Sequence, residues 1–263
     1  MSSVKLLSGW SNPGGSTHHH IALTNLLNSR GVNCTFYGPQ DYHLDKCRGE
    51  KIDKISITPD DILISHFLNV PNTPTWKQHI LSCHETNLFP LEQINLDGYD
   101  VVQYVSEKQK DWHNIDHVTA HPSFVIIPPL VDKVKWKSPE NNYAGVIGSI
   151  DSHKRPHQAI QQALDDGFSK VLLFGDITEM PYFNEEVHPY VERGQVILRG
   201  HESDREAMYE QIEAVYHSSL RETYGLVEAE CRLAGIPFRG ESNDQPVLSK
   251  DDIWERWESC LNL

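Results

Sequence analysis

Short apolar runs recur through the first half of the chain, separated by polar or glycine-containing stretches. Apolar runs of about five residues are typical of strands buried in a parallel sheet. Strands are therefore predicted at residues 4–8, 32–37, 61–65, 79–84, 101–106 and 124–127. Between the first two, Thr17 is a suitable N-cap for a helix that ends at Gly31. Strands that alternate with helices in this way predict an α/β fold with a parallel sheet.

Prolines and charged residues interrupt this alternation near the middle of the chain. Pro128 and Pro129 are followed by a polar stretch that runs to Asn142. This composition predicts a boundary between a first domain at 1–129 and a second domain at 130–263. In the second domain, strands are predicted at 143–148, 170–174, 196–198 and 214–216, and helices at 157–166 and 204–213. An amphipathic terminal helix is expected at 251–260, and it could pack back on the first domain.

Two carboxylates surround a predicted strand-to-helix turn in the second domain. Glu222 lies in the loop after the strand at 214–216, and Glu230 lies on the helix that follows Gly225 and ends at Gly235. Backbone N–H groups and the positive end of a helix converge at such a turn. The arrangement suits an anionic ligand that is rich in hydroxyl groups.

Two further stretches could approach an anion. Gly14 and Gly15 stand between the first strand and its helix, where glycine lets a backbone N–H come close to a ligand, although this signal is weak alone. Lys154 and Arg155 precede Pro156, which is suited to the first position of a helix. Cations at a helix N-terminus oppose its dipole, so either an anion binds there or both side chains are solvated surface groups.

The histidines give no strong metal signal. Residues 18–20 are consecutive histidines that would point in different directions on a helix, so a surface position is favoured over a shared ion. His113, His117 and His121 have helical spacing, but Pro122 indicates that the helix ends there, so they too are expected at the surface.

Strand ends place two more histidines where parallel sheets bind ligands. His66 and His84 each follow a predicted strand, and ligands bind beyond the carboxyl ends of such strands. A hydrogen-bonded structural role is the alternative for each of them.

Composition narrows the class of protein. The 263 residues carry a formal net charge of −14, which argues against sequence-blind binding of nucleic acid. Five scattered cysteines without a C-x-x-C pair favour reduced thiols in a cytoplasm over disulfides. No apolar run of about 18 residues predicts a membrane span, and the start of the chain lacks the apolar segment of a signal peptide.

Taken in order, these motifs resemble those of retaining glycosyltransferases of the GT-B fold, close to glycosyltransferase family 4. Glu222-x7-Glu230 with Tyr224-Gly225 is similar to the family signature. Weaker matches are Gly14-Gly15 with the N-terminal glycine loop, His84 with the strand-end histidine, Val105-Ser106 with the "vS" element, 126–132 with the interdomain linker, and Gly148 with Lys154 with the diphosphate site.

The resemblance implies two Rossmann-like domains that face a cleft, reduced in size, with specific roles for these residues. His84 and Glu222 would be catalytic. The donor would be bound by Gly14, Gly15, Lys154, Arg155, Glu222, Thr223, Tyr224, Gly225 and Glu230. Lys154 and the Gly15 amide would neutralise the diphosphate, Glu222 would hold sugar hydroxyls, and Glu230 would hold the ribose. Ser149 stands where the family carries arginine, which predicts altered donor binding.

The implied activity is a retaining transfer of a sugar from a nucleotide donor, with UDP- or GDP-sugar expected. No D-x-D motif occurs, so no metal and no further cofactor are expected. The acceptor is not specified by the sequence. Two alternatives stay open: a GT-B protein that binds a sugar nucleotide without transferring it, and a glycosyltransferase that acts on modified bases of viral DNA, which the −14 charge disfavours.

Overall fold

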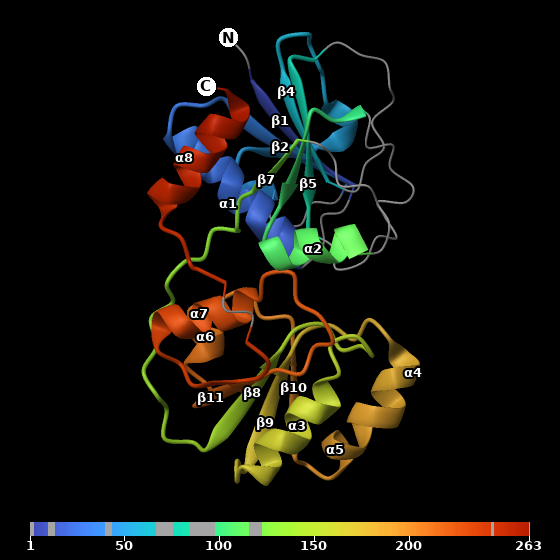
Figure 1. Ribbon diagram of the computed structural model, residues 1–263. Coiled ribbons are helices and arrows are strands. Elements are labelled where there is room, and N and C mark those ends of the chain that lie inside the picture. The colour runs from blue at the N-terminus through green and yellow to red at the C-terminus, as the bar shows by residue number, and fades with distance from the viewer. Residues whose placement is uncertain are drawn as a thin grey trace. The chain divides into compact units, whose positions relative to one another are not determined.

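The chain folds into two units, each built on one parallel sheet (Figure 1). The computed structural model describes residues 3–9, 14–39, 44–66, 76–84, 98–115, 123–242 and 245–262. Unit 1 comprises Met1–Leu130 and Pro246–Leu263, and unit 2 comprises Val131–Gln245. The α/β class with two parallel sheets is thus as predicted. Among the described residues, no helix combines the length and apolar character needed to cross a bilayer.

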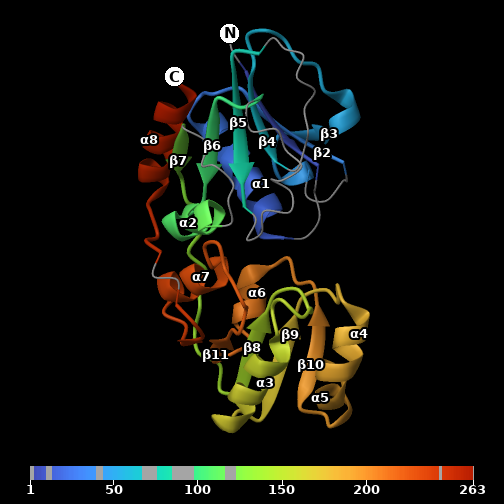
Figure 2. The ribbon, with the colours of Figure 1, turned by 45° about the vertical axis from the view of Figure 1, so that its right-hand side comes forward.

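Unit 1 contains a seven-stranded sheet in the order β3-β2-β1-β4-β5-β6-β7, and every pairing is parallel. Its strands are β1 (Val4–Ser8), β2 (Cys34–Gly38), β3 (Gly49–Lys51), β4 (Ile62–His66), β5 (Gln78–Cys83), β6 (Val101–Tyr104) and β7 (Phe124–Ile126). Figure 2 shows β5 between β6 and β4. The order reverses between β1 and β4, so the switch point of this sheet lies beyond their carboxyl ends.

The first helix begins earlier than predicted. Helix α1 spans Gly15–Ser29 with Gly14 as its N-cap, and Thr17 is buried inside it. The expected N-cap at Thr17 is therefore wrong, because the His18 N–H already donates to the Gly14 carbonyl at 3.2 Å. The other helical segments of unit 1 are η1 (Leu44–Lys46), η2 (Ile52–Lys54), α2 (Glu107–Ile115) and α8 (Lys250–Leu261).

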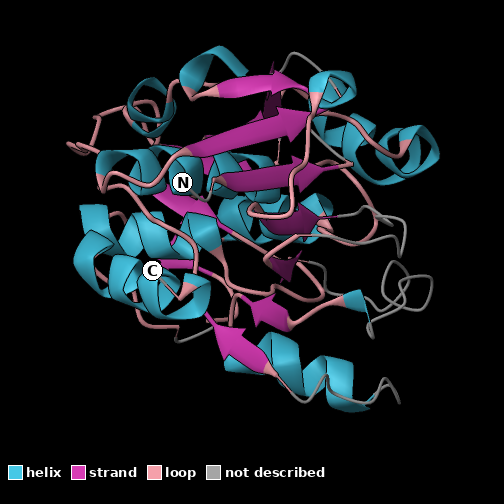
Figure 3. Ribbon diagram, turned by 90° about the horizontal axis from the view of Figure 1, so that it is seen from above, coloured by secondary structure: helices cyan, strands magenta, loops and turns pink. Residues whose placement is uncertain are grey.

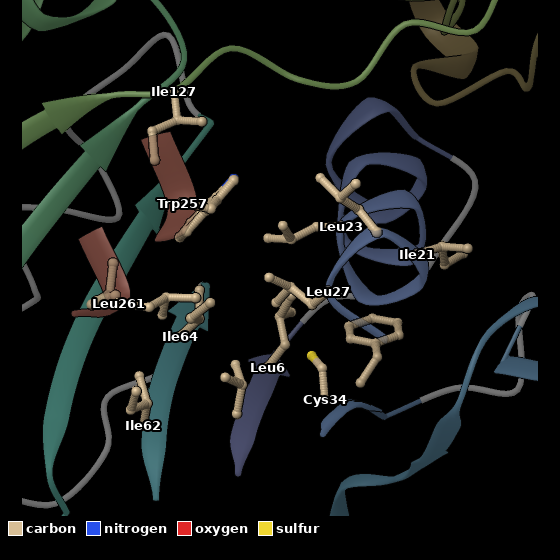
Figure 4. Close-up of a cluster of buried hydrophobic side chains, with 14 of the residues drawn as sticks. Leu6, Ile21, Leu23, Leu27, Cys34, Ile62, Ile64, Ile127, Trp257 and Leu261 are labelled. Carbon is tan, nitrogen blue, oxygen red and sulfur yellow. The ribbon is translucent and has the colours of Figure 1, made fainter. Parts of the chain in front are cut away.

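The terminal helix α8 completes the core of unit 1. Ser249 and Asp252 form a capping box at its start, which satisfies backbone donors that the first turn leaves open. Trp257 and Leu261 have no exposed surface and pack in one cluster with residues of α1 and the sheet. Figure 4 shows them pointing into the same space as Leu23 and Leu27 of α1.

Unit 2 contains a five-stranded parallel sheet in the order β10-β9-β8-β11-β12. Its strands are β8 (Tyr143–Ile147), β9 (Lys170–Phe174), β10 (Val196–Gly200), β11 (Ala214–Tyr216) and β12 (Phe238–Arg239), and its helices are α3 (Pro156–Asp165), α4 (Met180–Tyr182), the π-helical η4 (Phe183–Val187), α5 (His188–Glu192), α6 (Arg205–Tyr209) and α7 (Leu226–Ala234). Strands and helices are distinguished by colour in Figure 3. Here the order reverses between β8 and β11.

Helices in unit 2 differ from the prediction at two places. The helical stretch from Met180 to Glu192 was not expected. The helix predicted at 204–213 ends at Tyr209, because the Glu213 N–H already donates to the Tyr143 carbonyl at 2.8 Å and leads the chain into β11.

Candidate functional site

Two loops meet at the switch point of unit 2: the loop after β8 and the loop after β11. The Leu220 N–H donates to the His153 carbonyl at 2.9 Å, and the His153 Nε2 lies 3.1 Å from the carbonyl of Arg221. The Arg155 Nε donates to the Ser218 carbonyl at 3.0 Å. These bonds fix the two loops to each other, so side chains far apart in sequence converge beyond the carboxyl end of the sheet.

Lys154 and Glu222 meet in this convergence. The Lys154 ammonium pairs with Oε1 of Glu222, and the Nε2 of His217 lies 3.0 Å from the same oxygen. Burial opposes ionisation of Glu222, but the hydrogen bond from His217 and the charge of Lys154 outweigh it and lower the pKa of Glu222 to about 2. The carboxylate is therefore charged at any neutral pH, ready to accept hydrogen bonds.

Arg155 adopts a backbone conformation that is uncommon for arginine. Its φ of 47° and ψ of 47° are left-handed, and Pro156 then starts α3. Ser218 holds this residue by a second bond, since its hydroxyl donates to the Arg155 carbonyl at 2.6 Å. Non-glycine residues in this region store strain that the surrounding structure must offset, and such residues cluster at functional sites.

The helix α7 starts from a left-handed glycine. Gly225 is its N-cap with a φ of 79°, a value that favours glycine because there is no Cβ to clash. Tyr224, next to it, is buried, and burial raises the pKa of its hydroxyl to about 12. With Thr223, these residues form the turn that leads from Glu222 into α7, and its open N–H groups lie at the positive helix end.

Glu230 is buried on α7 and has polar partners within unit 2. The Arg205 guanidinium pairs with its Oε1, and the Tyr209 hydroxyl donates to its Oε2 at 2.7 Å. Its side chain is 3% exposed, whereas that of Arg205 is 32% exposed. Both oxygens of the residue expected to bind ribose are thus already engaged by α6.

We expect Arg205→Ala to lower the free energy of unfolding by roughly 2–4 kcal/mol, because it leaves a buried carboxylate without its cation. Urea unfolding followed by circular dichroism would measure this loss. In the Arg205→Ala background, Glu230→Gln removes the uncompensated charge and should recover part of the stability. Strictly additive losses in the double variant would contradict the pairing.

Ser149, which stands at the family's arginine position, is engaged by an acidic neighbour. Its hydroxyl donates to Oδ2 of Asp151 at 2.6 Å, and Thr178 donates to the same oxygen at 3.1 Å. The other oxygen of Asp151 accepts from the Lys154 amide at 2.8 Å. The loop thus contains a carboxylate that organises its own backbone, two residues from the position where a second cation was expected.

The remaining predicted residues belong to unit 1. Gly14 and Gly15 lie at the start of α1, and His84 directly follows β5. His84 belongs to a group of four imidazoles, the histidine cluster, composed of His19, His20, His66 and His84. Its ring centroids are 4.7 Å from those of His19, 5.1 Å from His20 and 5.4 Å from His66.

The tautomer of His84 follows from its hydrogen bonds. The Gln103 amide donates to the carbonyls of Tyr104 at 3.0 Å and Ile127 at 2.8 Å, so its Oε1 accepts the Ser82 hydroxyl at 2.8 Å. Having given its single proton, Ser82 can only accept from the Nε2 of His84, which lies 3.1 Å away. The neutral ring of His84 then carries its lone pair on Nδ1.

The cluster contradicts the surface position expected for the tract at 18–20, because His19 and His20 are buried at 2% and 0% exposure. Both ring nitrogens of His19 and the Nδ1 of His20 are buried without a hydrogen-bond partner among the described residues. Burial lowers the pKa of His19 to about 3, and it lowers those of His20 and His84 further. His117 and His121 lie outside the described residues.

Within the described ranges, no three His, Cys, Asp or Glu side chains are arranged to hold a metal ion. The expected absence of a metal stays a prediction.

No protein-family model and no curated protein matches this sequence. Solved structures match its fold. HepE of Anabaena, in complex with UDP-glucose, gives a TM-score of 0.69 at 14% identity over 98% of this chain and 90% of its own. WaaG, a glycosyltransferase involved in lipopolysaccharide biosynthesis, gives 0.62 at 14% identity over 100% and 91%. AviGT4, a glycosyltransferase involved in avilamycin A biosynthesis, gives 0.62 at 14% identity over 98% and 92%.

These neighbours are GT-B glycosyltransferases, and the chain has the GT-B fold in a small version of 263 residues. At such identity the likeness concerns the fold, and the residue roles taken from the family resemblance stay predictions. The structure brings together Lys154 and Glu222 as the donor-site prediction requires. The sequence reasoning missed His217, although its place directly after a strand at the switch point was a usable signal.

Proposed function

We propose that the chain is a glycosyltransferase that transfers a sugar from a nucleoside diphosphate donor, with retention of configuration and without a metal ion. The observation that carries the proposal is the meeting of Lys154 and Glu222 at the switch point of unit 2. A cation and a carboxylate there match the two parts of such a donor, its diphosphate and its sugar hydroxyls.

The proposed chemistry follows from charge. The diphosphate is the leaving group and gains negative charge as the sugar departs, so Lys154 and the helix N-termini would stabilise the transition state. Glu222 would hold sugar hydroxyls, and the turn at Thr223, Tyr224 and Gly225 would add backbone donors. His84, with its lone pair on Nδ1, is assigned by the family resemblance to the reacting end of the donor.

The comparisons support a sugar-nucleotide donor, because HepE was crystallised with UDP and with UDP-glucose. UDP-sugar is therefore our first choice and GDP-sugar the second. Gly14 and Gly15, Arg155 and Glu230 keep their proposed places in donor binding. For Glu230 the ribose would have to share the carboxylate with Arg205 and Tyr209.

Lys154→Ala tests the proposal. Loss of one positioned charge at the leaving group should lower the rate of nucleoside diphosphate release from the sugar nucleotide by roughly 10²–10³-fold. Release would be measured with UDP-glucose and GDP-mannose, with and without candidate sugar acceptors. The exposed cation Lys137, in the same unit, provides the control Lys137→Ala. Unchanged release in Lys154→Ala would reject the assignment.

One observation favours a second candidate, a protein that binds sugar nucleotide without transferring the sugar. Asp151 engages Ser149, so the position where the family carries a second cation contributes a carboxylate network instead. Binding of UDP-glucose with no release of UDP, in the presence of acceptors, would select this alternative over the transferase.

A further inference from the structure

His217 is held firmly at the carboxyl end of β11. Its N–H donates to the Arg239 carbonyl at 2.8 Å, and its ring lies 6.1 Å from that of Phe238, tilted by 33°. A Cβ added to Gly240 would come within 2.7 Å of the His217 carbonyl, so the neighbouring chain approaches closely there. With a side chain only 13% exposed, the imidazole has little freedom to turn.

The ring presents its Nε2 to Glu222 at 3.0 Å. Both contacts of this carboxylate, from His217 and from Lys154, go to Oε1. Among the described residues, Oε2 has no hydrogen-bond partner. The carboxylate is thus fixed through one oxygen while the other stays available to a ligand.

Donor binding would change the balance at Oε1. A diphosphate carries more negative charge than one carboxylate, so it would attract Lys154 and weaken its pair with Glu222. A neutral imidazole with its proton on Nε2 is not attracted to the phosphates in this way. It can therefore keep the carboxylate in place at the moment when the ammonium is engaged elsewhere.

The geometry points to His217 as a positioning residue, which holds Glu222 through Oε1 when a diphosphate recruits Lys154, so that Oε2 can accept a hydroxyl of the donor sugar. This inference rests on the proposed function, because it needs a sugar nucleotide at this site. Its signature is a loss of affinity for the sugar, with the affinity for the nucleoside diphosphate retained.

The test compares variants of His217 by calorimetry with UDP and UDP-glucose, or with GDP and GDP-mannose if the wild type prefers that pair. His217→Phe keeps a flat ring but removes the donor. It should bind the nucleoside diphosphate within twofold of wild type and the sugar nucleotide about tenfold more weakly, the effect of one hydrogen bond to a charged group. His217→Gln keeps a donor of similar reach and should recover most of that loss, whereas the shorter His217→Asn should not.

Equal weakening of both ligands in His217→Phe, or no weakening of either, would overturn the positioning role. A parallel measurement on Lys154→Ala separates this result from the proposed function. If Lys154→Ala loses affinity for both ligands while the His217 variants match wild type, only the inference about His217 fails. If the wild type binds neither pair, the proposed function fails with it.

Discussion

Lowering the pH from 7.5 to 5.5 should destabilise the folded chain by about 5 kcal/mol. Four buried histidines, His19, His20, His79 and His84, have pKa values lowered by burial, to about 3 for His19 and about 4 for His79. In the unfolded chain each would return to about 6.5. The folded state then binds fewer protons, so stability is complete above the unfolded pKa and falls as the pH drops below it.

The magnitude follows from the same linkage. At pH 5.5, one unit below the unfolded value, each neutral buried histidine costs about 1.4 kcal/mol, and four of them cost about 5. Domains of this kind have total stabilities of about 5–15 kcal/mol, so the loss is a large share. The carboxylate Glu222, with its pKa lowered to about 2, stays charged throughout this range and does not contribute.

Urea unfolding at the two pH values would measure the effect, and two variants would assign it. His19→Leu removes a buried imidazole whose nitrogens have no partner among the described residues, so it should reduce the acid loss by about 1.4 kcal/mol. His201→Gln changes an exposed histidine and should leave the loss unaltered. A loss of the same size in His19→Leu as in wild type would show that the histidine cluster is not its source.

The sheet strands were predictable because each is a short apolar run that reads the same in any context. The runs at 4–8 and 170–174 coincide with β1 and β9. The convergence of Lys154 and Glu222, 68 residues apart, was also accessible, since loops at the carboxyl ends of adjacent parallel strands meet.

Other features depend on packing that the sequence does not display. The stretch 180–192 contains Pro181 and Pro189 and a π-helical turn, which together obscure the helical period. The burial of His19 and His20 follows from the face that α1 turns to the sheet, and polar composition alone suggests the opposite. Arg205 as the partner of Glu230 required the position of α6, which no local pattern supplies.

Assignment of the terminal helix had to wait for the structure as well. Its amphipathic pattern predicted a helix, and the structure places that segment, from Pro246 onward, in unit 1 although it follows unit 2 in the chain. The chain therefore crosses between the units twice, once near Leu130 and once near Gln245. Folding of unit 1 consequently requires contacts between the two ends of the sequence, which tend to form slowly.

Trp257→Ala should be the most destabilising single change in the core of unit 1, with a loss of roughly 3–5 kcal/mol. Trp257 has no exposed surface and packs in the cluster that joins α8 to α1 and the sheet (Figure 4). Its Nε1 has no hydrogen-bond partner among the described residues, so Trp257→Phe should cost only about 1 kcal/mol for the lost volume. Glu258→Ala, an exposed change on the same helix, should be nearly neutral. Urea unfolding followed by circular dichroism would rank the three variants, and a Trp257→Ala protein as stable as Glu258→Ala would show that α8 does not complete this core.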